Sequence, residues 1–200
     1  MSKTLEFIFD FASPNAYLSY KILPPILERT GASVEIVPCL LGGIFKATGN
    51  QAPMVAFGGV KGKLEYEQLE MQRFIQQHGL DAFQFNPHFP VNTLTLARGA
   101  VAAAVSGDLD RYLEVGLAAM WEAGLKMDDA DVFVKAMNDG GLDGEALLAK
   151  TQDPDVKAQL IANTERAVER GAFGIPTFFV GDEMYFGKDR LDQVEVALAG

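Results

Sequence analysis

The chain is poor in the side chains that form disulfides and metal sites. Its 200 residues include one cysteine, Cys39, and two histidines, His78 and His88. A single cysteine excludes an internal disulfide and fits a reducing compartment, so the cytoplasm is the expected location. Neither histidine has further ligands at metal-binding spacing, and no dedicated metal site is expected.

Positive charge and long apolar runs are also scarce. The sequence has 17 Lys and Arg against 27 Asp and Glu, which gives a formal net charge of −10. This balance argues against nucleic acid as a partner, because phosphate binding needs a cationic surface. No apolar run is long enough to span a membrane. Glu6 and Asp10 interrupt the apolar run near the N-terminus, so no signal peptide is predicted.

What remains is ordinary globular composition, with 48% hydrophobic and 22% charged residues. Residues 4–11 and 33–37 alternate between apolar and polar side chains and are predicted strands. Residues 14–29 between them are a predicted helix, which Pro24-Pro25 should kink or interrupt. This β-α-β unit predicts two parallel strands joined by a right-handed crossover.

The middle of the chain is helical in pattern. Apolar residues at three- and four-residue spacing predict helices over 62–78, 93–106, 108–124, 128–138, 143–151 and 154–170. Asn92, Asp143 and Asp153 fit as caps, and Gly171 fits as a helix end. Residues 42–59 are rich in Gly, Ala and Pro and predict a loop that has room for one short helical turn.

Strand patterns return at the end of the chain. Residues 177–180 and 183–186 flank Gly181-Asp182, which predicts a tight hairpin. Asp189 is the expected cap of a final helix that ends at Leu198. The order of elements predicts an α/β fold, namely a thioredoxin-like domain made of residues 1–42 and 155–200 with a large all-helical domain, residues 43–154, inserted in it.

Ser13 occupies the place where a thioredoxin-type fold keeps its Cys-x-x-Cys pair, between the first strand and the first helix. Ser followed by Pro14 is also a favoured helix start that needs no function. The functional interpretation uses the same geometry, because a helix N-terminus stabilises an anion and lowers the pKa of a thiol. The sulfur would then come from a ligand, and glutathione is the expected one.

Two later segments fit such a ligand. Ile175-Pro176 enters a strand, and in a thioredoxin-like frame this loop faces the active helix with its backbone free to pair with a peptide. In the segment Gly187-Lys188-Asp189-Arg190, Asp189 could bind an amino group and Arg190 a carboxylate, which suits a γ-glutamyl end. The alternative for this segment is a capping Asp and a solvated Arg.

Four polar residues could line a pocket for an acidic organic substrate, namely Lys46, Asn50, Asn92 and Arg98. Taken separately, Lys46 is expected to be solvated and Asn92 to be a cap. Trp121, the only tryptophan, and Cys39 are expected to be packed core residues.

Together these motifs resemble the 2-hydroxychromene-2-carboxylate isomerases, relatives of kappa-class glutathione transferases and bacterial disulfide oxidoreductases. The resemblance covers nearly the whole chain and rests on Phe9-Asp10-Phe11-Ala12-Ser13-Pro14, Lys46-Ala47-Thr48-Gly49-Asn50, Phe89-Pro90-Val91-Asn92-Thr93, Gly174-Ile175-Pro176-Thr177 and Phe186-Gly187-Lys188-Asp189-Arg190-Leu191. It implies a glutathione-dependent isomerase, homodimeric, from naphthalene-type aromatic hydrocarbon catabolism.

The resemblance also implies residue roles. Ser13 matches the catalytic serine that supports the glutathione thiolate, and Ile175 matches the residue whose backbone pairs with the tripeptide. Gly187 to Arg190 match the segment that holds the γ-glutamyl end. Lys46, Asn50 and Asn92 match positions near the bound chromene acid, a small aromatic carboxylic acid. The implied reaction interconverts 2-hydroxychromene-2-carboxylate and trans-o-hydroxybenzylidenepyruvate.

One departure leaves the substrate open. Members of the family carry an Asn-Arg pair shortly after the Gly-Asn segment, whereas residues 53–57 here read Pro-Met-Val-Ala-Phe. A kappa-type glutathione transferase or peroxidase acting on another electrophile is therefore the alternative, followed by a non-catalytic thiol- or peptide-binding module. A disulfide oxidoreductase is disfavoured because Cys39 is alone and misplaced.

Overall fold

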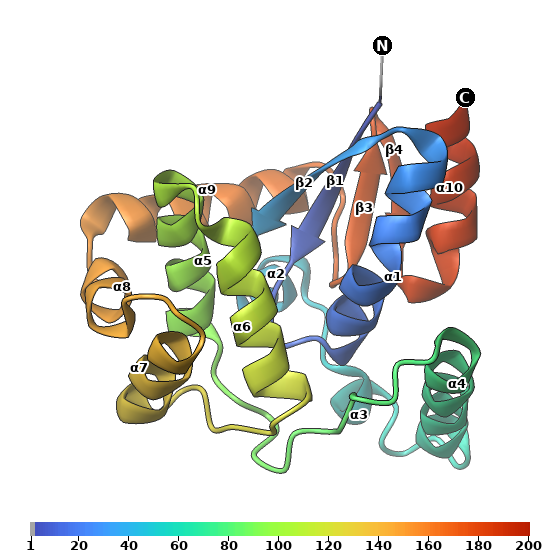
Figure 1. Cartoon of the computed structure of the whole chain (residues 1–200). Coiled ribbons are helices and arrows are strands. Elements are labelled where there is room, and N and C mark those ends of the chain that lie inside the picture. Colours follow the sequence, from blue (N-terminus) through green and yellow to red (C-terminus); the bar gives the residue numbers. More distant parts are fainter. Residues whose placement is uncertain (1–2) are drawn as a thin grey trace.

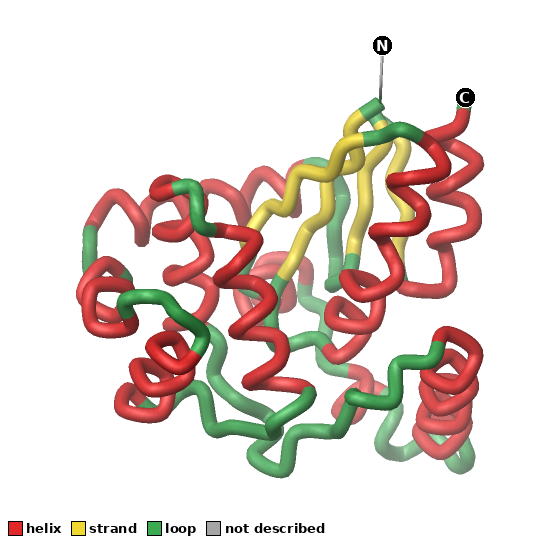
Figure 2. The backbone as a smooth tube through the Cα atoms, viewed as in Figure 1, coloured by secondary structure: helices red, strands yellow, loops and turns green. Residues whose placement is uncertain are grey.

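A computed structural model describes residues 3–200 (Figures 1 and 2). Its four-stranded sheet has the order β2-β1-β3-β4, with strands β1 (Thr4–Phe9), β2 (Ser33–Pro38), β3 (Thr177–Val180) and β4 (Glu183–Phe186). β1 and β2 are parallel, whereas β1 with β3 and β3 with β4 are antiparallel. The predicted β-α-β unit and the predicted hairpin are both confirmed.

Helices cover both faces of the sheet (Figure 1). α1 (Pro14–Thr30) and α10 (Leu191–Ala199) lie on one face, and α9 (Pro154–Glu169) crosses behind the other. α1 runs without a break through Pro24 and Pro25, so the predicted interruption is wrong. Burial of Leu23 and Ile26 on either side of the prolines holds the helix together and offsets the backbone hydrogen bonds that proline cannot make.

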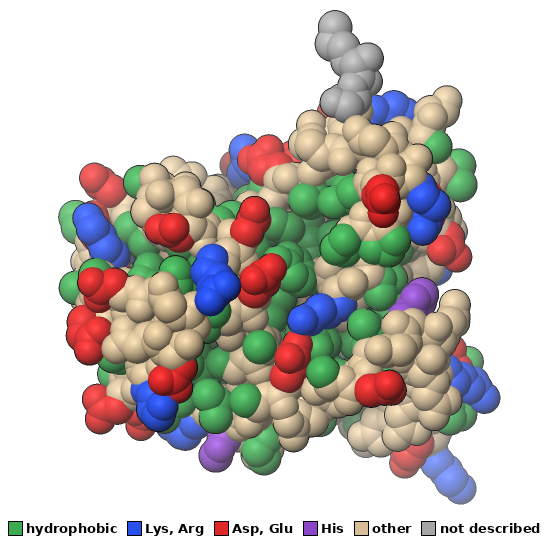
Figure 3. Space-filling view, in the orientation of Figure 1, with side chains coloured by type: hydrophobic (Ala, Val, Ile, Leu, Met, Phe, Trp, Pro, Cys, Tyr) green, Lys and Arg blue, Asp and Glu red, His purple; other side chains and the backbone are tan. Residues whose placement is uncertain are grey.

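The predicted central helices are confirmed to within three residues at each end. They are α4 (Lys63–His78), α5 (Leu94–Ser106), α6 (Leu109–Trp121), α7 (Ala130–Asp139) and α8 (Gly144–Lys150). α5 to α8 form a block beside the sheet, and α4 lies apart below α10 (Figure 1). On the face drawn in Figure 3, hydrophobic side chains gather along the junction between α6 and α1. One core cluster includes residues from both the strands and the helical block.

The segment 42–59, predicted as a loop, contains two helices, α2 (Leu41–Thr48) and α3 (Pro53–Ala56). Gly42 and Gly43 weaken the helix signal in the sequence, but Ile44 is fully buried and anchors α2. A Cβ on Gly43 would lie 3.1 Å from the Thr164 side chain of α9. The glycine therefore allows α2 to approach α9 closely.

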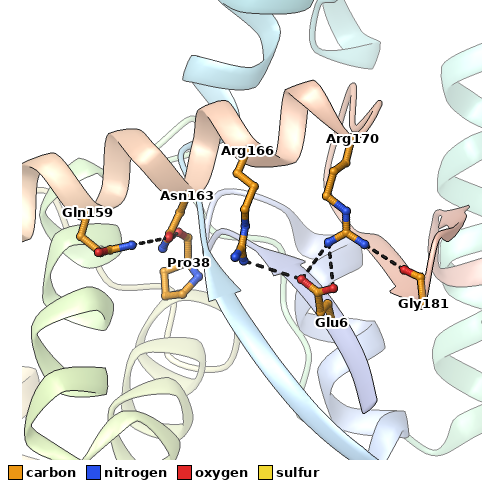
Figure 4. Close-up of polar contacts among 7 residues, drawn as sticks. All are labelled: Glu6, Pro38, Gln159, Asn163, Arg166, Arg170 and Gly181. Atoms are coloured by element: carbon orange, nitrogen blue, oxygen red, sulfur yellow. Dashed lines mark hydrogen bonds and ion pairs between the residues drawn. The ribbon is translucent and has the colours of Figure 1, made fainter. Parts of the chain in front are cut away.

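A charged cluster fastens α9 to the sheet (Figure 4). Nη1 of Arg170 lies 2.8 Å from both carboxylate oxygens of Glu6 on β1, and its Nη2 donates to the Gly181 carbonyl at 2.9 Å. The same guanidinium lies 3.8 Å above the Phe179 ring, and Arg166 approaches Glu6 at 3.6 Å. One arginine thus joins α9, β1 and the β3–β4 turn.

The packing of α6 against the end of β1 gives a first prediction. A Cβ on Gly116 would lie 2.6 Å from the buried Phe11 ring, whereas a Cβ on Gly42 has no neighbour within 4 Å. We expect Gly116→Ala to lower the free energy of unfolding by about 1–3 kcal/mol through overpacking. The control Gly42→Ala should raise it by about 0.5–1 kcal/mol through helix propensity. Urea denaturation measures both, and equal stabilisation by the two changes would contradict the tight contact.

Candidate functional site

Ser13 stands where the loop after β1 enters α1. Its Oγ accepts a hydrogen bond from the Ala16 N–H at 3.2 Å, as a helix cap does, and donates one to the Ile175 carbonyl at 2.9 Å. Only 5% of Ser13 is exposed. The Ile175-Pro176 peptide bond is cis. The structure therefore brings together the two segments that the sequence analysis singled out at opposite ends of the chain.

The N-terminus of α1 makes this site favourable for an anion. The first N–H groups of a helix have no partner within it, and the aligned peptide dipoles place partial positive charge there. α1 has no acidic residue in its first turn to use that charge. A thiolate next to Ser13 would gain from the dipole and from a hydroxyl that can donate a hydrogen bond.

The segment 187–190 lies beside the same loop. The Gly187 N–H donates to the Pro176 carbonyl at 2.9 Å. Lys188 is only 6% exposed, and its ammonium group lies 2.5 Å from the Asp189 carboxylate and 4.6 Å above the Phe74 ring of α4. Gly187 therefore adjoins the cis-proline loop, while the Lys188 side chain points toward α4.

Asp189 was predicted to cap the final helix, and this prediction is wrong. Residues Lys188–Arg190 form a separate turn of 3-10 helix, and α10 begins after it at Leu191 with no side-chain cap. The carboxylate of Asp189 is paired with Lys188 instead, and Arg190 is exposed and donates to the Asp189 carbonyl at 3.2 Å.

Asn50 is held next to the cis-proline loop. Its Nδ2 donates to the Phe173 carbonyl at 2.7 Å. The centres of the Phe173 and Phe186 rings lie 4.5 Å apart. Phe173 is 39% exposed and Phe186 is 42% exposed, so the two rings form an aromatic surface. This surface was not predicted from the sequence. Lys46 is exposed in the last turn of α2, two residues before the helix ends. An amide beside an aromatic pair is suited to an aromatic acid.

Asn92 and Arg98 lie at the start of α5. Asn92 was predicted to cap this helix. It stands one residue before the cap position, Thr93, and its side chain accepts from the N–H of Leu94, the first residue of α5, at 3.0 Å. Arg98 is partly buried, and within residues 3–200 its Nε is buried without a hydrogen-bond partner. Among these described residues, neither side chain hydrogen-bonds to Ser13.

Asp10 was not recognised as part of the site. It is 1% exposed; Oδ2 accepts from the Leu41 N–H at 2.7 Å and Oδ1 from the Ala12 N–H at 3.1 Å. Burial raises the pKa of Asp10 to about 6. The influence of Leu41, Thr93 and Ala12 acts in the opposite direction and lowers this pKa, but burial is the larger effect. The sequence did contain a signal for this role, because Asp10 is a charged residue at the end of an apolar strand, three positions before Ser13.

Trp121 and Cys39 are buried, as predicted. Trp121 has a further role, because its indole Nε1 donates to the Phe11 carbonyl at 2.9 Å and so fixes the loop that leads to Ser13. Burial raises the pKa of the Cys39 thiol to about 12. Cys39 is therefore neutral at physiological pH and is not an activated thiol.

A cavity of about 510 Å³ lies on the flank of α1, between this helix, the end of α4 and the start of α10. Lys21, Phe74 and Lys188 are among its lining residues, and Ser13 and Ile175 are not. Within residues 3–200, no group of three His, Cys, Asp or Glu side chains could hold a metal ion. In the same residues, no helix is both long enough and apolar enough to cross a membrane.

The chain is similar to known proteins over nearly its whole length. A family model described as a DSBA-like thioredoxin domain matches residues 4–199. The 2-hydroxychromene-2-carboxylate isomerase of Sphingobium xenophagum is 28% identical over 98% of this chain and 97% of its own length. Glutathione S-transferase kappa 1 of Homo sapiens is also 28% identical, over 96% of this chain and 89% of its own length.

Solved structures agree with this picture. A structure of 2-hydroxychromene-2-carboxylate isomerase has a TM-score of 0.83 and 28% identity, and the match covers 98% of this chain and 94% of that one. A probable DsbA oxidoreductase from Streptomyces coelicolor shares the fold. It is 19% identical, its TM-score is 0.74, and the match covers 98% of this chain and 88% of that one. The predicted fold class, thioredoxin-like with inserted helices, is confirmed.

The buried carboxyl of Asp10 gives stability a specific pH dependence. Its pKa is raised from 3.8 to about 6 in the folded protein, so the folded state binds this proton more tightly than the unfolded chain. The resulting stabilisation is present at low pH and is lost as the pH rises through about 6. The quantity to follow is the difference in unfolding free energy between the wild type and Asp10→Asn. We expect this difference, wild type minus variant, to fall by roughly 3 kcal/mol from pH 3 to pH 7. Urea unfolding at each pH measures this, and a constant difference would contradict it.

Proposed function

The chain belongs to the DSBA-like thioredoxin domain family, and from that membership and the site geometry we propose that it is a glutathione-dependent isomerase of the 2-hydroxychromene-2-carboxylate type. The observation that carries the proposal is the Ser13 hydroxyl, which caps α1 and lies 2.9 Å from the carbonyl before the cis proline. A thioredoxin-like site with serine in place of cysteine has no sulfur of its own, so a ligand must supply the thiol.

The residues present fit glutathione as that ligand. The N-terminus of α1 suits the thiolate, and the Ser13 hydroxyl can turn from Ile175 to donate to sulfur. Next to Ser13, the Oδ1 atom of Asn15 is buried and, within residues 3–200, has no hydrogen-bond partner. An unsatisfied buried acceptor is costly, and an N–H group of a peptide ligand would satisfy it.

In this proposal, bound glutathione supplies a nucleophilic thiolate that adds reversibly to a conjugated substrate and is recovered after the reaction. Ser13 stabilises the thiolate by donating a hydrogen bond, and the α1 N-terminus adds its partial positive charge. The Ile175 backbone and Pro176 orient the peptide, and the segment from Gly187 through Lys188 and Asp189 to Arg190 holds the γ-glutamyl end.

The substrate side of the site rests on different residues. Lys46, Asn50 and Asn92 would bind the carboxylate and hydroxyl groups of the chromene acid. The ring would pack on the pair formed by Phe173 and Phe186, and Asn50 donates to the Phe173 carbonyl. The proposed reaction interconverts 2-hydroxychromene-2-carboxylate and trans-o-hydroxybenzylidenepyruvate in naphthalene-type catabolism, and the buried neutral Cys39 fits a cytoplasmic enzyme. We also propose that residues 1–42 and 155–200 form the glutathione-binding unit around the inserted segment 43–154.

A kappa-type glutathione transferase is the second candidate. It is favoured by the similarity to human glutathione S-transferase kappa 1 and by α3, which stands where an Asn-Arg pair was expected. The two candidates differ in what happens to glutathione. A transferase accumulates a glutathione conjugate in proportion to turnover, whereas an isomerase works with a catalytic amount of glutathione.

The test of the proposed function is an ultraviolet assay of the chromene acid with and without glutathione. We expect turnover only with glutathione, and Ser13→Ala should lower kcat by about 100-fold or more because one donor to the reacting sulfur is lost. The same variant should lose about 1 kcal/mol of unfolding free energy through its helix cap.

Ser19→Ala is the matched control for that experiment. Ser19 is also a buried serine of α1, and its hydroxyl donates to the Asn15 carbonyl at 2.8 Å. This variant should keep wild-type turnover. Equal loss of turnover in both variants would show that the effect of Ser13 is structural, and the absence of any glutathione requirement would overturn the proposal.

We further propose a homodimer that uses an uncovered apolar surface around α3 and the start of α4. No residue of α3 or α4 is buried in the single chain. The exposed apolar side chains in this part are Met54, Val55, Phe57, Val60, Tyr66 and Leu69. Six exposed apolar side chains within residues 54–69 favour an interaction site in this part of the chain.

Sedimentation equilibrium tests the dimer. We expect twice the monomer mass for the wild type and a shift toward the monomer for Val55→Asp, because burying the new charge in the interface is unfavourable. Val196→Asp on α10 is the control, because Val196 is exposed to a similar extent, 74% compared with 67% for Val55. The Val196→Asp variant should remain dimeric. A monomeric wild type would contradict the proposal.

A further inference from the structure

The carboxylate of Asp10 touches three segments that carry the proposed site. Oδ1 accepts from the Ala12 N–H at 3.1 Å, in the loop that leads to Ser13. Oδ2 accepts from the Leu41 N–H at 2.7 Å, at the first position of α2. The Thr93 side chain, one residue after Asn92, acts on the same carboxylate and lowers its pKa. These segments are distant in sequence and meet at one buried side chain.

We propose that Asp10 is a positioning residue, which sets the Ser13 hydroxyl relative to α2 through its hydrogen bonds to Ala12 and Leu41. The inference rests on the proposed function and extends it. One oxygen of Asp10 orients the thiolate-binding loop, and the other holds the helix that carries Lys46. A displacement of this side chain would therefore move both halves of the site at once.

The contacts explain why a carboxylate is needed at this position. Two of its partners, Ala12 and Leu41, are backbone N–H groups, which can only donate. A carboxylate offers acceptors alone, whereas a protonated acid or an amide places a donor against one of these N–H groups. The N-terminus of α2 also favours negative charge. The charge of Asp10 raises the pKa of the buried Cys39 thiol, and the charge of Arg166 on α9 lowers it.

The experiment compares Asp10→Asn with the wild type and with Thr164→Val. Thr164 also holds the start of α2, because its Oγ1 accepts from the Leu40 N–H at 3.1 Å, but Thr164 belongs to α9. The first readout is the pH titration of bound glutathione by thiolate absorbance near 240 nm. The second is kcat together with the affinity for S-methylglutathione, which has no thiol to ionise.

Two effects of Asp10→Asn on the bound thiol oppose each other. Removal of the Asp10 negative charge lowers the thiol pKa, whereas loss of the Ser13 donor geometry raises it, and we expect the second effect to prevail by about one unit. We expect the kcat of this variant to fall by about 10- to 100-fold. Its affinity for S-methylglutathione should stay within about threefold of the wild type, because only the donor geometry at sulfur changes. Thr164→Val should leave the thiol pKa unchanged. Thr93→Val, which removes one donor and keeps the side-chain shape, should shift the thiol pKa in the same direction by less.

Amide exchange followed by NMR tests the same contacts without glutathione. In Asp10→Asn, the Ala12 and Leu41 amides should both exchange faster, whereas in Thr164→Val the Ala12 amide should not. Wild-type thiol pKa and kcat in Asp10→Asn would overturn this inference and leave the proposed function standing. A wild type that titrates no bound thiol would overturn the proposed function, and the role of Asp10 with it.

Discussion

The candidate site depends on the antiparallel pairing of β1 with β3. Ile8 pairs with Thr177 in this register, so the residues that follow β1 and those that precede β3 meet at one edge of the sheet. The hydrogen bond from Ser13 to Ile175 closes this edge. A change of register by one residue would separate the two groups and exchange the side chains on the two faces of β1. The sheet therefore determines the chemistry that the loops can perform.

Several contacts keep the loop after β1 in one conformation. Trp121 holds the Phe11 carbonyl, Asp10 holds the Ala12 N–H, and the Phe9 carbonyl accepts from the Cys39 N–H at 2.8 Å. Trp121 comes from α6 and Cys39 from the residues that follow β2, whereas Asp10 belongs to the loop itself. An ionised Asp10 opposes folding because of its burial, yet it supplies two directed bonds at the site. This pattern is typical of functional regions, where local order is obtained at some expense to stability.

Much of the fold could be predicted from the sequence, because its signals are local. Apolar spacing located the central helices, and alternation located the strands. The same logic failed where packing decides: α2 contains two glycines but forms around the buried Ile44, and α1 continues through Pro24 and Pro25. Asp189 has the residue type of a cap, but Lys188 takes its carboxylate.

The site was predictable in part for the same reason. Ser13 and the Ile175-Pro176 segment carry recognisable local patterns, and the structure places them together. Asp10 could not be identified in this way, because its partners Leu41 and Thr93 are far away in the chain. The aromatic pair of Phe173 and Phe186 likewise exists only after β3 and β4 have paired.

The two ends of the described chain lie close together, at the pole of the molecule away from the Ser13 loop (Figure 1). The Lys3 ammonium group donates to the Ala197 carbonyl at 2.6 Å. A short linker could therefore join the ends, and new termini could be opened in the exposed turn around Gly59. Such a circular permutant would leave the Ser13 loop and the cis-proline loop unbroken, and an affinity tag joined near Lys3 or Gly200 would lie away from both.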